Sequence, residues 1–214
     1  MIDLYTWATP NGRKVSIALE ELGLPYRVHA VNIANGEQFS EEFARISPNQ
    51  KIPAIVDSDT GLTLMESGAI LMYLAGKAGR LLPSEPKRYW EAIQWLMWQK
   101  AAFGPMLGQA LHYLKYNRGK STYSEDRFEI ETHRLYRVLD RRLESGEYIA
   151  AGEYTIVDIA CWPWAARHEY QSVDLREYPH VREWYMRIAE RPAVRAGWAV
   201  PVAEDIPMPS PVGA

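Results

Sequence analysis

The sequence contains a single cysteine, Cys161, among its 214 residues. One cysteine cannot form a disulfide within the chain, so we expect a fold without disulfides and a reducing location, the cytoplasm. Its neighbours Ala160 and Trp162 are apolar, and a cysteine in such a segment usually behaves as a small buried hydrophobic residue. Residues 1–160 contain no cysteine, which excludes a Cys-x-x-Cys dithiol cycle in that part of the chain.

The sequence also lacks a strong excess of one charge and a long apolar run. The net charge of −3 argues against a nucleic-acid partner but leaves a small, locally anionic ligand possible. The apolar runs fall short of the roughly 18 residues that span a bilayer, and the first residues, MIDLYTW, have no basic segment typical of a signal peptide, so we expect no membrane association. The five histidines are scattered without metal-ligand spacing, so we expect no metal.

The stretch from Asn49 to Ser67 reads as a β-hairpin that ends in a helix start. Two β-prone runs, 54–56 and 62–64, flank Ser58-Asp-Thr-Gly61, a dense turn signal. Pro53 stands just before the first run, where a residue without a backbone N–H belongs at a strand start, on an edge or in a cis turn. Ser67 after the second run is a good N-cap for the apolar segment that follows.

The hairpin and the helix start that follows it, residues 49–67, together indicate an anion-binding site. A helix N-terminus offers N–H donors and a positive dipole end, which suit a carboxylate, and Glu66 would suit a neighbouring ammonium group. The alternative interpretation is that Ser67 only caps a helix and Pro53 only shapes a turn. Each residue alone favours that alternative, whereas the two together at this spacing favour a binding site.

The order of the predicted elements indicates an α/β half followed by an all-α half. Residues 2–6 and 26–31 read as strands around a helix that ends at Gly23, and a short helix at 40–46 precedes the hairpin. This order is that of a thioredoxin-like domain, which we place at residues 1–78. We expect a linker at 79–88, a helical domain at 89–200 and an extended or disordered Pro-rich tail at 201–214.

The second half carries helical periodicity. Apolar residues recur at helical spacing from Trp90 to Ala101, and Gly104-Pro105 should kink or break that helix. Another amphipathic helix is expected from about Asp126 to Glu144, and a last one around 181–188. Thr155 and Asp158 form a capping-box pattern ahead of the apolar run 159–164.

Together these motifs resemble the glutathione transferase superfamily over residues 1 to about 198. The segments 9–14, 46–56, 66–70, 104–109 and 158–164 are similar to the bacterial nu class, which includes glutathione-dependent disulfide-bond reductases. The resemblance implies a thioredoxin-like domain followed by an all-helical one, a homodimer, and glutathione as substrate or co-substrate with a disulfide or an electrophile.

The resemblance also implies roles for particular residues. Thr9 and Asn11 occupy the place of the group that activates the glutathione thiol, as Tyr, Ser or Cys does elsewhere in the superfamily. The remaining positions that the resemblance assigns to glutathione are Gln38, Lys51, Ile52, cis Pro53, Glu66 and Ser67, with Arg134 reaching a glutathione in the partner subunit. The alternatives are an N-cap for Thr9, a turn residue for Asn11, and solvated polar side chains for Gln38, Lys51 and Arg134.

The leading hypothesis is disulfide-bond reduction in which glutathione supplies both thiols, with conjugation as a weaker activity. The first alternative is an ordinary conjugating transferase. The second is a non-catalytic interaction module on the same fold, as in some elongation-factor subunits. The Thr9–Asn11 loop and the Glu66-Ser67 pair argue against that module, which need not keep them. The second substrate would lie against helical-domain side chains such as Met106, Tyr113 or Tyr116.

Overall fold

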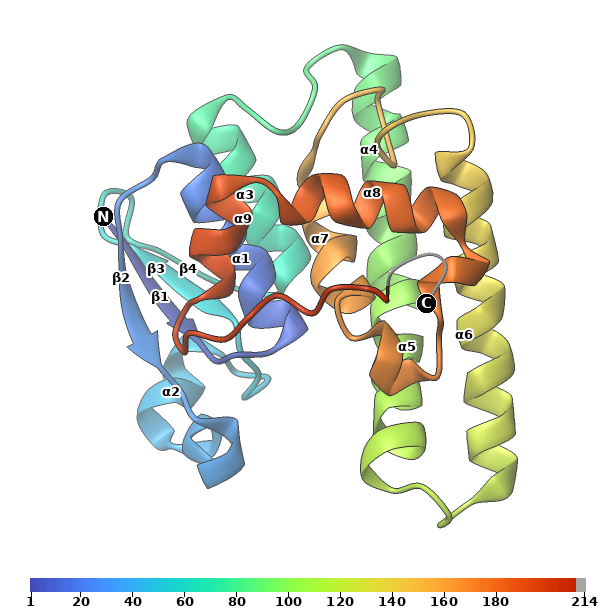
Figure 1. Cartoon of the computed structure of the whole chain (residues 1–214). Coiled ribbons are helices and arrows are strands. Elements are labelled where there is room, and N and C mark those ends of the chain that lie inside the picture. The colour runs from blue at the N-terminus through green and yellow to red at the C-terminus, as the bar shows by residue number, and fades with distance from the viewer. Residues whose placement is uncertain (211–214) are drawn as a thin grey trace. The chain divides into compact units, whose positions relative to one another are not determined.

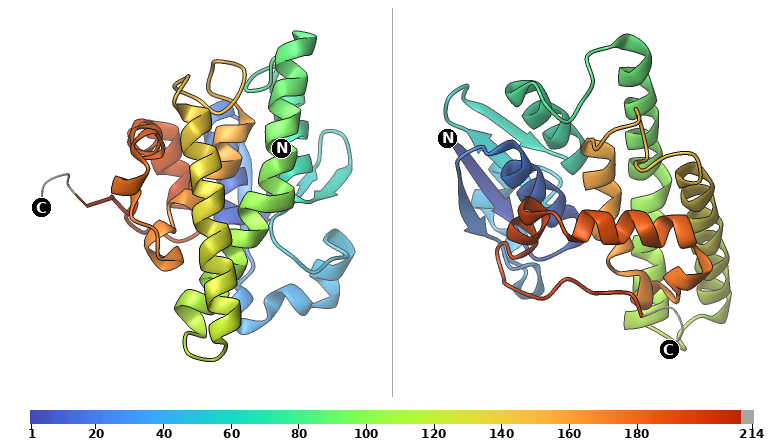
Figure 2. Two further views of the ribbon diagram at one scale, coloured as in Figure 1. Left: turned by 90° about the vertical axis from the view of Figure 1, so that its right-hand side faces the viewer. Right: turned by 45° about the horizontal axis from the view of Figure 1, so that its top comes forward.

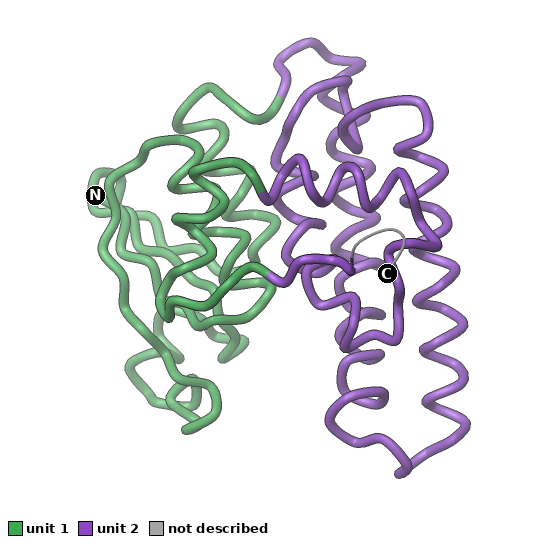
Figure 3. The backbone as a smooth tube through the Cα atoms, viewed as in Figure 1, with its two compact units in different colours: residues 1–82, 190–206 green, residues 83–189, 207–214 purple. Residues whose placement is uncertain are grey.

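The computed structural model describes residues 1–210, which form two compact units, coloured separately in Figure 3. Unit 1 contains residues 1–82 and 190–206, and unit 2 contains residues 83–189 and 207–210. This division differs from the boundaries expected from the sequence because residues 190–206 pack with unit 1. Of the Pro-rich tail predicted at 201–214, residues 201–210 form neither helix nor strand, and residues 211–214 lie outside the described residues.

Unit 1 is built on a four-stranded mixed sheet. The strands β1 (Ile2–Thr6), β2 (Tyr26–Ala30), β3 (Ala54–Asp57) and β4 (Leu62–Met65) lie in the order β2-β1-β3-β4. β1 pairs with β2 in parallel, as expected for a strand–helix–strand crossover, and β3 pairs antiparallel with both β1 and β4. The predicted hairpin is therefore confirmed as β3–β4.

Helices cover both faces of this sheet. α1 (Pro10–Leu22) and α3 (Ser67–Ala78) pack against each other and against the strands, and the side chains of Ile2, Leu4 and Thr6 in β1 are buried (Figure 1). On the other side, Tyr5 and Phe43 belong to a second small core with Val31 and Ala54, where Phe43 comes from α2 (Glu41–Ile46). The expected thioredoxin-like arrangement is confirmed.

Local sequence explains where these helices start and stop. α1 ends at Gly23, whose φ of 67° lies in the left-handed region that glycine adopts at low cost. α2 begins after Ser40, whose hydroxyl accepts a hydrogen bond from the N–H of Phe43. Between β2 and α2 the chain forms two 3-10 turns, Ile33–Asn35 and Glu37–Phe39.

Unit 2 is helical throughout its regular parts. It contains α4 (Pro86–Trp98), α5 (Gly104–Ala110), α6 (Thr122–Leu143), α7 (Ile156–Ala165) and α8 (Pro179–Ala189), with 3-10 turns at His168–Gln171 and Leu175–Glu177. In Figure 2, α6 runs beside the long path formed by α4 and α5, with which it packs. None of the helices within residues 1–210 is both long and apolar enough to cross a membrane.

The helix that contains Gly104-Pro105 is widened rather than broken. π-helical turns at Gln99–Phe103 and Leu111–Tyr116 flank α5 and join it to the neighbouring helical segments. Such turns are one way in which a helix accommodates a proline or a close approach. A Cβ on Gly104 would lie 2.6 Å from the side-chain amide nitrogen of Gln99, so a larger residue here would displace that side chain.

The apolar repeat that predicts α4 does not face the core of unit 2. Trp90 is 66% exposed and Met97 47% exposed, whereas Ala92 and Leu96 are fully buried. The periodicity of α4 thus holds two apolar stripes, and among the described residues the stripe with Ala92 and Leu96 is the buried one.

The capping box predicted at Thr155 and Asp158 is present at the start of α7. The buried carboxylate of Asp158 accepts hydrogen bonds from the N–H of Thr155, the N–H of Ile149 and the indole of Trp184. One side chain therefore joins the helix start, the preceding loop and α8. Burial without a cationic partner raises the pKa of Asp158 to about 6 despite these hydrogen bonds.

Candidate functional site

Strand registers bring the three predicted segments of the site to one end of the sheet. Tyr5 pairs with Ala54, so Thr6 at the end of β1 lies opposite Pro53. Ala54 also pairs with Met65, so Pro53 lies opposite Glu66. The loop after β1, the segment before β3 and the start of α3 therefore meet at the same edge, as the hypothesis of a binding corner requires.

The loop after β1 leads directly into α1 through Thr9. Thr9 is the N-cap: its hydroxyl oxygen accepts a hydrogen bond of 3.2 Å from the N–H of Gly12, and Pro10 follows at the first helical position. The hydroxyl hydrogen of Thr9 is not used in that bond and can be donated to another acceptor. The capping role and the role in thiol activation are thus compatible, and Asn11 lies half-buried in the same turn.

Gly12 fixes how closely α1 approaches this loop. A Cβ at Gly12 would lie 2.2 Å from the carbonyl oxygen of Trp7 and 2.5 Å from the hydroxyl of Thr6. No side chain fits in that space, so glycine is required at position 12 for the start of α1 to pack on the end of β1. A glycine directly after Asn11 at a helix start is the sequence signal for such a close approach.

The segment before β3 has a constrained backbone. The peptide bond between Ile52 and Pro53 is cis, as the resemblance implies. The hydroxyl of buried Ser47 donates a hydrogen bond of 2.9 Å to the carbonyl of Lys51, which fixes the loop from inside. Within residues 1–210, nothing hydrogen-bonds the backbone N–H or C=O of Ile52, so a ligand backbone can pair with them. Ser47 was not singled out in the sequence analysis.

The start of α3 differs by one residue from the prediction. Glu66, not Ser67, is the N-cap, and Ser67 is the first helical residue. The reason is the backbone of Glu66, whose φ of 71° and ψ of 108° turn the chain out of β4 while its carbonyl accepts from the N–H of Ile70. A positive φ costs about 1–3 kcal/mol for a residue with a side chain, and such strain gathers at functional sites.

Gln38 and Lys51 lie at the margins of this edge. β2 runs parallel to β1, with Ala30 beside Thr6, and leads into the 3-10 turn that carries Gln38. The side-chain oxygen of Gln38 is buried and has no hydrogen-bond partner among the described residues. The side chain of Lys51 is exposed, whereas its carbonyl is held by Ser47.

Arg134 lies on α6 in unit 2 and already has a partner. Its guanidinium forms two hydrogen bonds of 2.7 Å to the carboxylate of Glu131 one turn earlier, and this pair raises the pKa of Arg134 and lowers that of Glu131. The side chain is exposed, as expected for a residue on the outer surface of α6. A second ligand for Arg134 would have to share it with Glu131.

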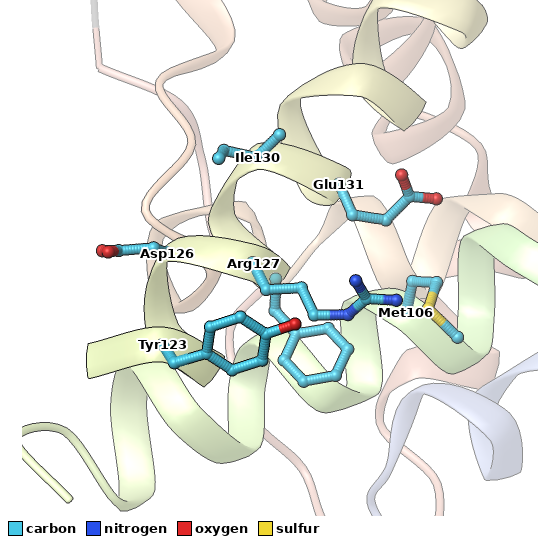
Figure 4. A pocket seen from close by; sticks show the side chains of 7 residues that line it. Met106, Tyr123, Asp126, Arg127, Ile130 and Glu131 are labelled. Carbon is cyan, nitrogen blue, oxygen red and sulfur yellow. The ribbon is translucent and has the colours of Figure 1, made fainter. Parts of the chain in front are cut away.

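Unit 2 contains a cavity of about 530 Å³ between α5 and the first half of α6 (Figure 4). Apolar groups of Met106, Phe128 and Ile130 meet the charged side chains of Arg127 and Glu131 there. Met106 was among the side chains predicted to contact a second substrate. The cavity is large enough for a drug-sized molecule, and its lining suits an apolar body with a polar end.

A smaller cavity of about 240 Å³ in unit 1 lies between the ends of β1 and β2 and α2. Tyr5 and His29 stack there with ring centroids 4.5 Å apart, and His29 contacts Asp3 at 2.7 Å. Burial, with nearby Asp3 and Glu42, raises the pKa of Tyr5, so this tyrosine is no readily ionised group. None of the predicted glutathione contacts lines this cavity.

Cys161 is fully buried in α7, as expected from its apolar neighbours. Among residues 1–210, no group of three or more His, Cys, Asp or Glu side chains is arranged to bind a metal ion.

Comparison with protein families identifies both halves of the chain. Residues 1–76 match the family described as glutathione S-transferase, N-terminal domain, and residues 99–192 match glutathione S-transferase, C-terminal domain. The chain is 48% identical over 198 residues to the disulfide-bond oxidoreductase YfcG of Escherichia coli, covering 90% of this chain and 92% of that protein. It is 39% identical to the disulfide-bond oxidoreductase YghU of the same organism, covering 92% of this chain and 73% of YghU.

Solved structures agree with the fold. A glutathione transferase from Pseudomonas putida, with one glutathione disulfide bound per subunit, superposes with a TM-score of 0.89 at 42% identity, covering 94% of this chain and 91% of that one. A glutathione transferase from Burkholderia graminis, with two glutathione molecules bound per subunit, gives a TM-score of 0.90 at 42% identity, covering 94% and 88%.

Proposed function

This chain belongs to the glutathione S-transferase family, and we propose that it acts as a glutathione-dependent disulfide-bond oxidoreductase. In this proposal glutathione supplies both thiols, and conjugation of electrophiles is a weaker activity. The support comes from the similarity to two disulfide-bond oxidoreductases, from the glutathione disulfide and paired glutathiones in the solved relatives, and from the architecture of unit 1.

One observation carries the proposal. A helix N-cap, an unpaired backbone next to a cis proline and a strained helix start meet at one edge of the sheet, formed by Thr9, Ile52-Pro53 and Glu66-Ser67. These features suit the parts of a tripeptide in turn. The N-terminus of α3 suits an α-carboxylate, Glu66 an α-ammonium, and the backbone of Ile52 a peptide unit. We assign Gln38 and Lys51 to the glycyl end.

The proposed reaction consists of two thiol–disulfide exchanges. The first glutathione thiolate attacks one sulfur of the substrate disulfide, which forms a mixed disulfide and releases one substrate thiolate. The second glutathione thiolate attacks the glutathione sulfur of that mixed disulfide, which forms glutathione disulfide and releases the second substrate thiolate. The two released thiolates take up two protons, which balance the two protons lost by the glutathione thiols.

Thr9 and Asn11 are the groups that we assign to thiol activation. A free thiol has a pKa of about 8.5, and lowering it by about one unit requires roughly 1.4 kcal/mol of preference for the anion. A hydrogen bond to a charged group supplies about 1.5–3 kcal/mol, and the N-terminus of α1 adds a few tenths. Mild activation suits exchange because the best attacking thiol has a pKa near the ambient pH.

We propose further that the protein is a cytoplasmic homodimer. Large side chains on α4 and α6 are exposed within unit 2, among them Trp90, Met97, Tyr123 at 75% and Ile130 at 68%. These exposed apolar side chains support the proposal because they are available to pack against a partner subunit. In such a dimer, Arg134 would contact glutathione bound by the partner subunit, and the cavity beside α6 would receive the body of the second substrate.

The direct test compares two reactions of the purified protein. We expect robust glutathione-driven reduction of a small disulfide together with slow conjugation of a chloronitrobenzene. Fast conjugation with negligible disulfide turnover would favour an ordinary conjugating transferase. Failure of both reactions, and of retention on glutathione resin, would favour a non-catalytic interaction module.

A further inference from the structure

The first two turns of α1 contain two buried cationic side chains. Arg13 is 0% exposed and Lys14 is 1% exposed, and they follow Thr9 and Asn11 directly in the helix. The N-terminus of a helix carries a partial positive charge, which disfavours cations there, and the first turn of α1 contains no acidic residue. Burial adds a desolvation cost. Two buried cations at a helix start therefore need a compensating negative charge or a function, because helix starts favour acidic over basic side chains.

The compensation for Arg13 comes from the segment that follows α9 (Pro192–Trp198). The guanidinium of Arg13 lies over the indole ring of Trp198, 3.6 Å from the ring centroid, and forms an ion pair with Glu204. The indole N–H of Trp198 donates a hydrogen bond of 3.2 Å to the backbone carbonyl of Asp205, which closes the segment around the pair. The side chain of Glu204 remains 41% exposed, so the arginine is buried and its counter-charge is not.

α9 and α1 are in direct backbone contact. The hydroxyl of Ser16 donates a hydrogen bond of 2.6 Å to the carbonyl of Gly197, and a Cβ on Gly197 would lie 2.5 Å from the backbone of Ile17. The segment after α9 therefore starts from a fixed point on α1. Residues 199–206, which we call the strap, belong to unit 1 with α1.

The other charges around α1 are paired or lie elsewhere on the helix. Arg191, the N-cap of α9, forms two hydrogen bonds, of 2.6 and 2.8 Å, with Glu21 near the C-terminal end of α1. The further charged groups on α1, on α9, on α3 with its N-cap and on the strap are Lys14, Glu20, Arg195, Glu66, Lys77 and Asp205, and Glu20 accepts a hydrogen bond from the hydroxyl of Tyr26. Within the strap, only Glu204 is paired with a cation in the first two turns of α1.

From this arrangement we propose that Glu204 is a tuning residue for the glutathione thiol: its carboxylate offsets the charge of Arg13 and so limits how much of the bound thiol is ionised. The inference rests on the proposed function, because it needs a glutathione thiol at the start of α1. Arg13 lies one helical turn from Thr9, so the pair and the thiol are on the order of 10 Å apart. At that distance one unit charge near a protein surface, screened by salt over about one Debye length, shifts a thiol pKa by about half a unit.

A limited ionisation of the glutathione thiol agrees with the chemistry of thiol–disulfide exchange. An uncompensated Arg13 would act together with the helix N-terminus and give a more acidic thiol, which is more ionised but less nucleophilic. With Glu204 in place, activation stays mild. Glu204 touches no reacting atom in this account, so its effect must appear in the ionisation of the thiol and not only in stability.

The test measures the ionisation of glutathione bound to Glu204→Gln, which keeps the size and the hydrogen-bond acceptor of the side chain but removes its charge. Ultraviolet absorbance of the thiolate is followed against pH for the protein with saturating glutathione. We expect the pKa of the bound thiol to fall by about half a unit, which raises the thiolate fraction at neutral pH about twofold. The acid limb of disulfide turnover should move to lower pH by the same amount.

Two variants serve as matched controls. Asp205→Asn removes the same charge from the neighbouring residue, whose side chain is not the one paired with Arg13 and whose backbone carbonyl accepts the bond from Trp198, and should shift the thiol pKa by clearly less. Glu204→Asp keeps the charge and should leave the thiol pKa in place. Equal shifts in Glu204→Gln and Asp205→Asn, or no shift in Glu204→Gln, would overturn the inference while the proposed function stands. A thiolate signal missing from every protein, the unsubstituted one included, would overturn the proposed function itself.

Discussion

Ser67 is the single residue on which the glutathione corner depends most. Its side chain is 2% exposed at the first turn of α3, next to the strained Glu66. Ser67→Ala should weaken glutathione binding by about 1–3 kcal/mol, because a hydrogen bond to a charged group is lost. Isothermal calorimetry measures the change directly, and Ser84→Ala, at an exposed position outside the corner, should bind like the unsubstituted protein. If Ser67→Ala binds glutathione with unchanged affinity, Ser67 serves only the start of α3 and does not bind glutathione.

Thr9 has two roles that a pair of substitutions separates. Thr9→Ala removes both the cap to Gly12 and the proposed hydrogen bond to the thiolate, so it should lower the free energy of unfolding by about 1 kcal/mol and slow turnover by about tenfold or more. Thr9→Ser keeps the hydroxyl and should restore both. Thermal denaturation and initial rates of disulfide reduction report the two effects. If Thr9→Ala loses stability but keeps its rate, Thr9 is only a cap.

Asn11→Ala should slow the same reaction by a similar factor, since it removes a side-chain donor next to Thr9 in the first turn of α1. The cap of α1 is Thr9 and not Asn11, so the effect that tests the assignment of Asn11 is the one on rate. Initial rates and a melting curve distinguish an effect on rate from one on stability, and a fall in melting temperature with full activity would contradict the assignment.

Most elements of unit 1 and the capping box at Thr155 follow from local signals, whereas the cis form of Pro53 was expected only from the resemblance to glutathione transferases. The local signals depend on residues close in sequence, such as Gly23 at a helix end or Ser40 at a helix start. The exact start of α3 was missed by one residue because the unusual backbone of Glu66 is imposed by the turn out of β4. Sequence patterns carry little information about such strain.

Features that depend on distant packing escaped prediction. α9 has only seven residues and is held on α1 through the contact of Gly197, which no local pattern reveals. The exposed stripe with Trp90 on α4 looks like a core stripe, since apolar periodicity alone does not distinguish an internal contact from an external one. The burial of Arg13 likewise depends on the strap, about 190 positions later in the sequence.

The hairpin β3–β4 is tied to α3 by Asp57. Its buried carboxylate accepts hydrogen bonds from Lys77 at 2.8 Å and from Tyr73 at 2.5 Å. Burial alone would raise the pKa of Asp57, but the hydrogen bonds from Lys77, Tyr73 and the N–H of Asp59 outweigh it and lower the pKa from 3.8 to about 2. The unfolded chain therefore binds a proton at higher pH than the folded one.

This difference predicts a pH dependence of stability. The contribution of Asp57 is fully present above about pH 4 and is lost as the pH falls through about 2. Asp57→Asn should be less stable at neutral pH and should show a shallower loss of stability between pH 4 and 2, measured by urea denaturation at each pH. Equal slopes for both proteins would contradict this account of the hairpin.

At the scale of the whole molecule, the proposed dimer gives a simple expectation. Light scattering at micromolar concentration should report twice the chain mass of 24.5 kDa. Ile130→Glu places a charge in the exposed apolar surface of α6 and should shift the protein toward monomer, whereas Tyr170→Glu, at a 37% exposed site outside α4 and α6, should not. A monomer in the unsubstituted protein would remove the cross-subunit role of Arg134.

The central claim is that glutathione supplies both sulfurs of the exchange. Cys161 is the only cysteine of the chain and is fully buried in α7, so the protein's own thiol is not needed. The most direct test is the rate of glutathione-driven reduction of a small disulfide by Cys161→Ser. The account predicts turnover close to that of the unsubstituted protein, after correction for any loss of folded protein measured by circular dichroism. Loss of turnover in a folded Cys161→Ser protein would contradict the two-glutathione mechanism.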